Sequence, residues 1–140
     1  MNRYYNVISG VSSWEEGIRQ SAEPLLVNNI VNEEYVDAMI NNVKVNGNYI
    51  IISPYIAMPH ARSEYGALDT GFSILKLKEG VEFPNNKPVK LFITFASTDN
   101  ERHLEILQEF ALILSDEKNL DVLLNTENVD DLKNILEKGE

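Results

Sequence analysis

Histidine is the side chain best suited to chemistry in this chain, which has two histidines and no cysteine. Without cysteine there is no disulfide, no thiolate zinc site and no cysteine nucleophile. His60 ends the apolar stretch "IAMPH" and directly follows Pro59. A proline fixes its own φ and biases the preceding residue, Met58, toward an extended backbone. We therefore expect the His60 imidazole at a strand end, where a neutral ring with an ordinary pKa of about 6.5 can act as a nucleophile.

A second histidine and three other polar side chains can join His60 around one small anion. These candidates are His103, Arg62, Ser63 and Ser97. His103 lies three residues after Asn100, an expected N-cap, and the unpaired N–H groups at a helix start attract anions. The planar guanidinium of Arg62 suits a phosphate or a carboxylate, and the two serines add hydroxyl groups. Together these residues predict a site for a small oxyanion.

Each candidate also has a structural explanation. A histidine in a folded domain is most often hydrogen-bonded and inert, and His103 shares a helical stripe with Leu107 and Phe110. Arg62 can equally be a surface cation. The two histidines stand far apart in the sequence, so a zinc site would need two carboxylates from elsewhere, and we expect no metal. Neither GxxxxGK[ST] nor GxGxxG occurs, so we expect no nucleotide and no cofactor.

Periodicity places these residues between helices and strands. Ser13-Trp14-Glu15-Glu16 has the form of a capping box at a helix start, and Pro24 is expected to kink or split that helix. Helices are expected from Ser13, from about Asn32 as N-cap to a point before Gly47, and from Asp99 or Asn100, with short helices at about 120–124 and 129–138. Strands are expected at 49–52, 56–58, 71–78 and 89–97. Helices on both sides of a few strands predict an α/β domain with three layers, α/β/α.

Composition excludes several classes of protein. Twenty-two acidic residues against twelve basic ones give a net charge of −10, which argues against binding to nucleic acid and favours a basic protein partner. No apolar run approaches the roughly 18 residues that a membrane-spanning helix requires, and "MNRYYNVISG" lacks a signal-peptide pattern. We find no repeat and no linker. We therefore expect a single cytoplasmic domain over residues 1–140, without direct membrane insertion.

Three stretches of the sequence follow one known pattern. They are "SWEEGIRQSAEPLLVNNIVNEEYVDAMINNV", "NYIIISPYIAMPHARSEYGALDTGFSILKL" and "VKLFITFASTDNERHLEIL". This pattern resembles enzyme IIA of the bacterial sugar phosphotransferase system (PTS), in the mannitol and fructose class (type 2) and most closely its ascorbate-type branch. The PHxR element, its apolar strand and the downstream TGF are the specific part, and His103 is a weaker second match. The resemblance covers nearly the whole chain.

The resemblance implies a phosphotransferase relay. His60 would accept a phosphoryl group from the phosphohistidine of the phosphocarrier protein HPr. It would pass that group to a cysteine of enzyme IIB, which phosphorylates sugar emerging from the membrane permease IIC. His103 would assist without carrying phosphate, and a mixed sheet would lie between helices. Such transfer needs an in-line nucleophile and donors around the phosphoryl oxygens, a role for which we expect Arg62 and the helix amides.

Other functions remain open at this point. The rival hypothesis is a regulatory IIA-like module, whose phosphorylation state controls its binding to a transcription factor or another protein, because the same fold hosts both roles. A histidine phosphatase is a weaker alternative, since no carboxylate adjoins His60 in sequence to protonate a leaving alcohol. Relatives usually carry glycine where this chain has Tyr55, and often at Ala61, so the sugar is not inferred. Neither the oligomeric state nor the phosphorylated nitrogen follows from the sequence.

Overall fold

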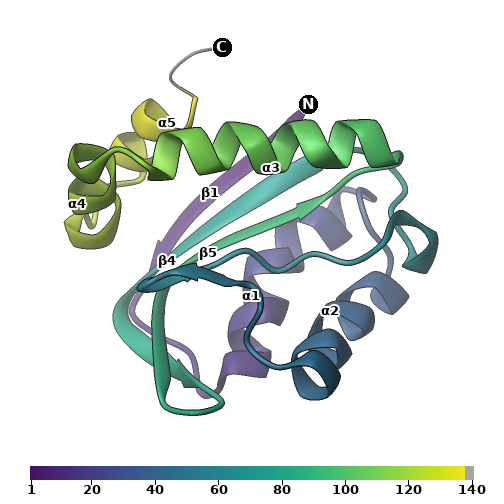
Figure 1. Cartoon of the computed structure of the whole chain (residues 1–140), viewed down its shortest axis with the longest axis horizontal. Coiled ribbons are helices and arrows are strands. Elements are labelled where there is room, and N and C mark those ends of the chain that lie inside the picture. Colours follow the sequence, from purple (N-terminus) through teal and green to yellow (C-terminus); the bar gives the residue numbers. More distant parts are fainter. Residues whose placement is uncertain (138–140) are drawn as a thin grey trace.

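A mixed five-stranded sheet lies between two layers of helices in the computed structural model, which describes residues 1–137 (Figure 1). The elements are β1 (Asn2–Ile8), α1 (Trp14–Val27), α2 (Glu33–Asn46), β2 (Ile51–Ser53), β3 (Tyr55–Ala57), the 3₁₀ turn η1 (Ser63–Tyr65), β4 (Gly71–Phe83), β5 (Lys87–Ala96), α3 (Asn100–Leu114), α4 (Glu117–Asn125) and α5 (Val129–Leu136). The strand order is β1-β4-β5-β3-β2. β1 runs parallel to β4 and β3 parallel to β5, while the β4–β5 and β2–β3 pairs are antiparallel.

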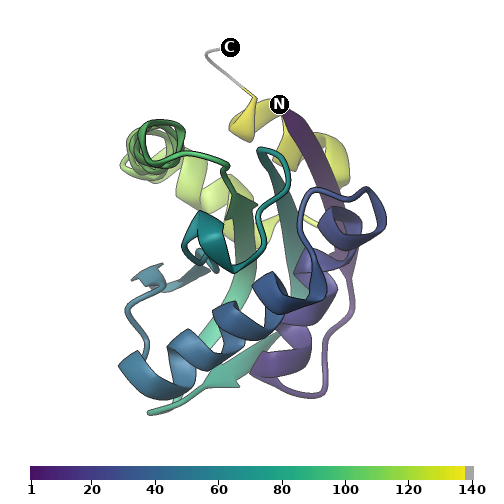
Figure 2. The same cartoon turned by 90° about the vertical axis from the view of Figure 1, so that its right-hand side faces the viewer.

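Each face of the sheet packs against its own group of helices (Figure 2). α1 and α2 cover one face, and α3, α4 and α5 cover the other. On the central strand β5, Phe92 belongs to the first core and Ile93 to the second, and neither side chain is exposed. Burial of each such side chain contributes about 1.5–3 kcal/mol to folding. The prediction of a three-layer α/β/α domain with a mixed sheet is confirmed.

The predicted caps of the first two helices are confirmed. The Ser13 hydroxyl accepts a hydrogen bond from the Glu16 amide at 3.1 Å, and the Asn32 side chain accepts one from the Tyr35 amide at 3.0 Å. Pro24, in contrast, does not split α1, which continues to Val27. Because this proline lies in the last turn of the helix, few intrahelical bonds remain after it to be disturbed.

Several strand boundaries differ from the prediction. β1 was not predicted at all, because it is an edge strand with a weak apolar alternation, yet it pairs with β4 from Asn2↔Gly71 to Ile8↔Leu77. β2 and β3 are three residues each, and β4 continues beyond the predicted end to Phe83. The last expected helix begins at Val129 as predicted and ends at Leu136, while position 138 lies outside the described residues.

Gly66, at the end of the loop that follows His60, anchors that loop to the start of α2. Its φ is +135°, its carbonyl accepts a hydrogen bond from the Asn32 amide at 3.0 Å, and an added Cβ would overlap the Asn32 side chain. We predict that Gly66→Ala lowers the free energy of unfolding by about 1–3 kcal/mol in urea titrations. The matched control is Gly47→Ala, where φ is also positive but no atom lies within 4 Å. An equal or smaller loss at Gly66 would contradict this explanation.

Candidate functional site

His60 lies just beyond β3, on a main chain that packing holds in place. Met58 and Pro59 before it are buried, and the Met58 amide donates to the Ile50 carbonyl at 2.8 Å. The Nδ1 atom of His60 lies 2.7 Å from the Met58 carbonyl oxygen. A carbonyl oxygen only accepts hydrogen bonds, so Nδ1 carries the ring proton and Nε2 keeps a free lone pair. The ring also stacks on that of Phe95, with 4.9 Å between the ring centroids and an interplanar angle of 25°.

His103 lies beside His60, although the two are distant in the sequence. The ring centroids are 5.3 Å apart with an interplanar angle of 67°, and the His103 ring is also 5.1 Å from that of Phe95. Both histidines therefore rest on one aromatic side chain at the end of β5. The neighbouring strands β3 and β5 are parallel, so their carboxyl ends meet at this edge of the sheet, a common position for binding sites in α/β folds.

The start of α3 differs by one residue from the N-cap used for the prediction. Asp99 is the N-cap, and its carboxylate accepts a hydrogen bond from the Arg102 amide at 2.6 Å. His103 is consequently four residues after the cap, and its own amide donates to the Asp99 carbonyl at 3.1 Å. Ser97 is buried and its hydroxyl donates to the same carbonyl at 2.9 Å. The Ser97 hydroxyl thus supports the helix start that carries His103.

Arg62 and Ser63 occupy the loop after His60. The Arg62 side chain is 78% exposed, and its Nε lies 2.6 Å from Glu64 Oε1. Ser63 begins the turn η1, where its carbonyl accepts hydrogen bonds from the amides of Gly66 and Ala67. The structure therefore brings His103 to His60 but directs Arg62 toward Glu64. An exposed ion pair of this kind contributes at most about 1 kcal/mol, so an anion at His60 can compete for the guanidinium.

Comparison with known proteins identifies the family to which this site belongs. The model of the family described as "Phosphoenolpyruvate-dependent sugar phosphotransferase system, EIIA 2" matches residues 5–139. The chain belongs to this family. Its members are phosphotransferase relay proteins of the sugar PTS, and the resemblance seen in the sequence is thereby confirmed.

Three relatives show how far the similarity of this EIIA chain extends. The mannitol-specific cryptic phosphotransferase enzyme IIA component of Escherichia coli K12 is 38% identical over 135 residues, 96% of this chain and 92% of the relative. Its E. coli solution structure covers 97% of this chain and 92% of its own, with a TM-score of 0.90. The ascorbate-specific PTS EIIA component of E. coli K12 is 33% identical over 87% and 81% of the two chains. A complex of enzyme IIAMTL with phosphorylated enzyme IIBMTL from E. coli matches at 28% identity and TM-score 0.81, covering 97% and 94%.

The surroundings of the two histidines of this EIIA chain favour the neutral form of both rings. Burial lowers the pKa of His60, and the hydrogen bond to the Met58 carbonyl partly opposes that shift. The positive charge that His103 gains when it is protonated lowers the pKa of His60 further. Burial likewise lowers the pKa of His103. A neutral imidazole has the lone pair that an attack on phosphorus requires. Among residues 1–137, no group of three or more His, Cys, Asp or Glu side chains is placed to hold a metal ion.

The lowered pKa of His60 predicts how the stability of this EIIA chain depends on pH. Because the ring binds its proton less tightly when folded, the unfolded state takes up more protons as pH falls. The free energy of unfolding should therefore decline as pH drops through about 6.5 and below. We expect urea titrations between about pH 7.5 and 5 to show a steeper decline for the wild type than for His60→Gln. Equal slopes in the two proteins would contradict the shift.

An exposed aromatic side chain lies against the His60 ring. Tyr49 is 48% exposed, and its ring meets that of His60 edge-on with 6.1 Å between the centroids. Met58, two residues before His60, lines a groove of about 450 Å³ together with Ile52, Ser53, Leu107, Ala111, Leu114 and Ser115. Ile52 is 46% exposed, and Leu104, which follows His103, is 55% exposed. Sequence reasoning missed the roles of Tyr49 and Phe95, because an aromatic residue in or beside an apolar strand gives no signal that distinguishes the site from the core.

Among the described helices, none is both long and apolar enough to cross a bilayer.

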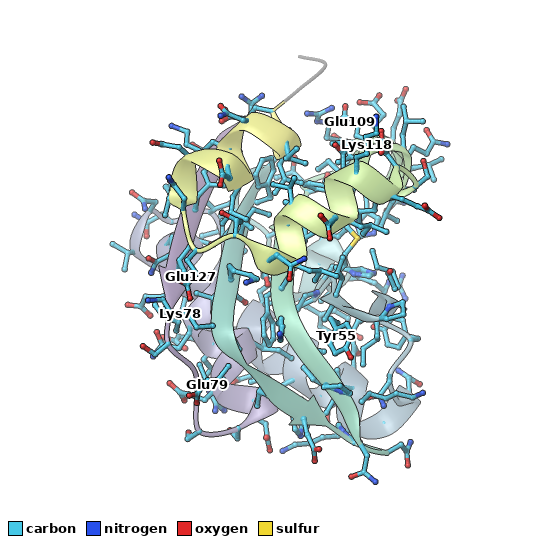
Figure 3. All side chains as sticks on the ribbon, turned by 90° about the vertical axis from the view of Figure 1, so that its left-hand side faces the viewer. Tyr55, Lys78, Glu79, Glu109, Lys118 and Glu127 are labelled. Atoms are coloured by element: carbon cyan, nitrogen blue, oxygen red, sulfur yellow. The ribbon has the colours of Figure 1, made fainter. Side chains whose placement is uncertain are left out.

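Tyr55 has a backbone conformation that is uncommon for a residue with a side chain. Its φ is +71°, in the left-handed region that favours glycine. A tyrosine there costs about 1–2 kcal/mol. The ring is 43% exposed and the Lys90 ammonium lies 5.9 Å from its centroid. Figure 3 shows Tyr55 on the opposite side of the strands from Lys78 and Glu79. The structure therefore places an exposed aromatic side chain on a strained backbone position of β3.

Proposed function

We propose that this chain is a cytoplasmic phosphoryl carrier of a sugar PTS. It accepts a phosphoryl group on His60 from the phosphohistidine of HPr and passes it to a cysteine of enzyme IIB, which serves the permease IIC. The observation that carries this proposal is the hydrogen bond from His60 Nδ1 to the Met58 carbonyl, because it leaves Nε2 free beside the second imidazole. Membership of the EIIA family supports the same role.

Nε2 of His60 is the proposed nucleophile. Its lone pair attacks phosphorus in line, the new N–P bond forms as the N–P bond of phospho-HPr breaks, and the HPr imidazole keeps the electron pair of the broken bond. In the second step a cysteine thiolate of IIB attacks the phosphorus, an S–P bond forms, and His60 regains its lone pair. No separate base is required, since a neutral imidazole loses no proton when it forms the N–P bond.

The phosphoryl oxygens need donors as their charge develops. We infer that His103 donates a ring N–H to one oxygen, because its ring lies 5.3 Å from that of His60. The first-turn amides of α3 add further donors at the positive end of the helix dipole. Arg62 can contribute only after its guanidinium leaves Glu64, and we assign it that role in the phosphorylated state. Ser63 and Ser97 support the loop and the helix start through the bonds described above.

The apolar surface around His60 is the proposed docking face for both protein partners. Transfer requires the donor phosphohistidine and the acceptor cysteine to reach Nε2 in turn, so both partners must cover His60 and the exposed Tyr49 ring beside it. The net charge of −10 favours a partner with basic residues around its phosphohistidine. The solved complex of IIAMTL with phosphorylated IIBMTL supports a IIB partner for this chain as well.

Reconstitution with purified partners tests the relay. The chain is phosphorylated with phosphoenolpyruvate, enzyme I and HPr, separated from them, and mixed with IIB proteins of the mannitol and ascorbate types. We expect the label to move to a IIB cysteine, and the type that accepts it fastest indicates the sugar class. Phosphorylation without transfer to any IIB would favour the regulatory module instead. Slow loss of the label to water as the only reaction would favour a phosphatase.

A further inference from the structure

The buried hydroxyl of Tyr35 binds the main chain next to His60. Tyr35 lies in the first turn of α2 and has no exposed surface. Its hydroxyl oxygen accepts a hydrogen bond from the Ala61 amide at 3.0 Å. Its proton lies within reach of two carbonyl oxygens, that of Phe95 at 2.8 Å and that of Ala61 at 3.1 Å. One hydroxyl thus joins α2, the residue after His60 and the end of β5.

Both peptide groups that flank His60 are tied to Phe95. On the preceding side, the Phe95 amide donates directly to the Pro59 carbonyl at 3.2 Å. On the following side, Ala61 connects to the Phe95 carbonyl through the Tyr35 hydroxyl. Phe95 is also the residue whose ring stacks on the His60 imidazole. Phe95 and Tyr35 therefore hold the main chain that carries the imidazole in a fixed position relative to the ring on which the imidazole stacks.

We propose that Tyr35 is a positioning residue for phosphoryl transfer, holding the 59–61 main chain so that His60 Nδ1 keeps its bond to Met58 and Nε2 faces the phosphorus. This inference rests on the proposed function of His60. The Nδ1–carbonyl bond selects the nucleophilic nitrogen, and its geometry follows from the backbone between Met58 and Ala61. A displacement of about 1 Å at a reacting group can cost ~100-fold in rate, so a small loosening of this segment is measurable.

The rest of the loop is held by hydrogen bonds that do not involve Tyr35, so loss of the Tyr35 hydroxyl should affect the segment at His60 without unfolding the loop. Asn32 and Ile30 bind Gly66, Leu68 and Asp69 through backbone hydrogen bonds that do not involve Tyr35. A phenylalanine at position 35 would fill the same apolar core and lose only the oxygen. Burial also raises the pKa of Tyr35 far above its usual range, so the hydroxyl remains a protonated donor at any pH at which the protein is studied.

The test compares Tyr35→Phe with Ser21→Ala. Ser21 of α1 is also buried, and its hydroxyl oxygen lies 2.6 Å from that of Thr94 on the same strand β5. This hydrogen bond joins α1 to the sheet and does not involve the His60 loop. Two quantities are measured: the tautomer of His60 by ¹⁵N NMR, and the rate of phosphoryl uptake from phospho-HPr. For Tyr35→Phe we expect a mixture of ring tautomers and a kcat lowered about tenfold with little change in KM. For Ser21→Ala we expect neither change.

Several results would overturn the role of Tyr35. A folded Tyr35→Phe with the wild-type tautomer and rate would do so, as would an equal fall in rate for Ser21→Ala. If Tyr35→Phe fails to fold, 4-fluorophenylalanine is placed at position 35, because its fluorine fills the volume of the hydroxyl without donating a proton. The wild-type tautomer and rate in that variant would likewise overturn the role of Tyr35. In the wild type, rapid hydrogen exchange of the Ala61 amide would also refute the bond. A wild type that takes up no phosphate would refute the proposed function alone, and the tautomer measurement would still decide the role of Tyr35.

Discussion

We expect His60→Gln to abolish phosphorylation of this chain by phosphoenolpyruvate, enzyme I and HPr. Glutamine keeps a polar group of similar reach but has no ring nitrogen with a free lone pair, so no N–P bond can form. Intact-mass measurement should show one phosphoryl group on the wild type and none on the variant. The group on the wild type should be lost in acid, because an N–P bond is acid-labile.

The second histidine supplies the matched control for this experiment. His103→Gln removes the other imidazole of the pair, 5.3 Å away, and should still acquire one phosphoryl group. Because His60 is half-buried and stacked on Phe95, its replacement can also loosen the site, so the fold of each variant is checked by NMR. Unchanged labelling of His60→Gln, or a label found on His103, would overturn the assignment of the nucleophile.

We expect His103→Ala to slow both phosphoryl transfers without preventing them. Removal of one donor that stabilises developing charge at a reaction centre typically costs about 10²–10³-fold, and we expect the lower end because the α3 amides and Arg62 remain. The variant should also raise the pKa of His60 toward its ordinary value, since the charge of His103 lowers it. Rapid-quench measurement of uptake from phospho-HPr and of transfer to IIB tests the rates, and an NMR titration tests the pKa.

A conservative variant distinguishes donation from packing at this position. His103→Asn retains an N–H donor on a shorter side chain, so it should recover part of the rate that alanine loses. If the loss came only from the missing contact with Phe95, asparagine and alanine would behave alike. Normal rates in both variants would make His103 a packing residue of α3.

Agreement between the sequence and the structure is greatest where the signal is local. The caps at Ser13 and Asn32 depend on residues three positions away, and both occur as predicted. The Pro59-His60 dipeptide places an imidazole beyond a short strand for the same reason. The predicted ends of strands were less accurate, because they depend on which neighbouring strand each one pairs with. β1 forms only because β4 presents an edge to it, a feature that residues 2–8 do not encode in their own apolar pattern.

The sequence by itself predicted the layers, from apolar periodicity along the chain, and the family, from its resemblance to known EIIA motifs, and both are confirmed. His60 as the nucleophile is a prediction from the same motif. Only the tertiary structure decided which groups meet at the site. It set His103 beside His60 on the shared ring of Phe95, paired Arg62 with Glu64, and brought the Tyr35 hydroxyl behind Ala61. The choice of Nε2 depends on the main-chain conformation of residues 58–60. Such contacts join residues far apart in the chain, and their distances are set by how the helices pack on the sheet.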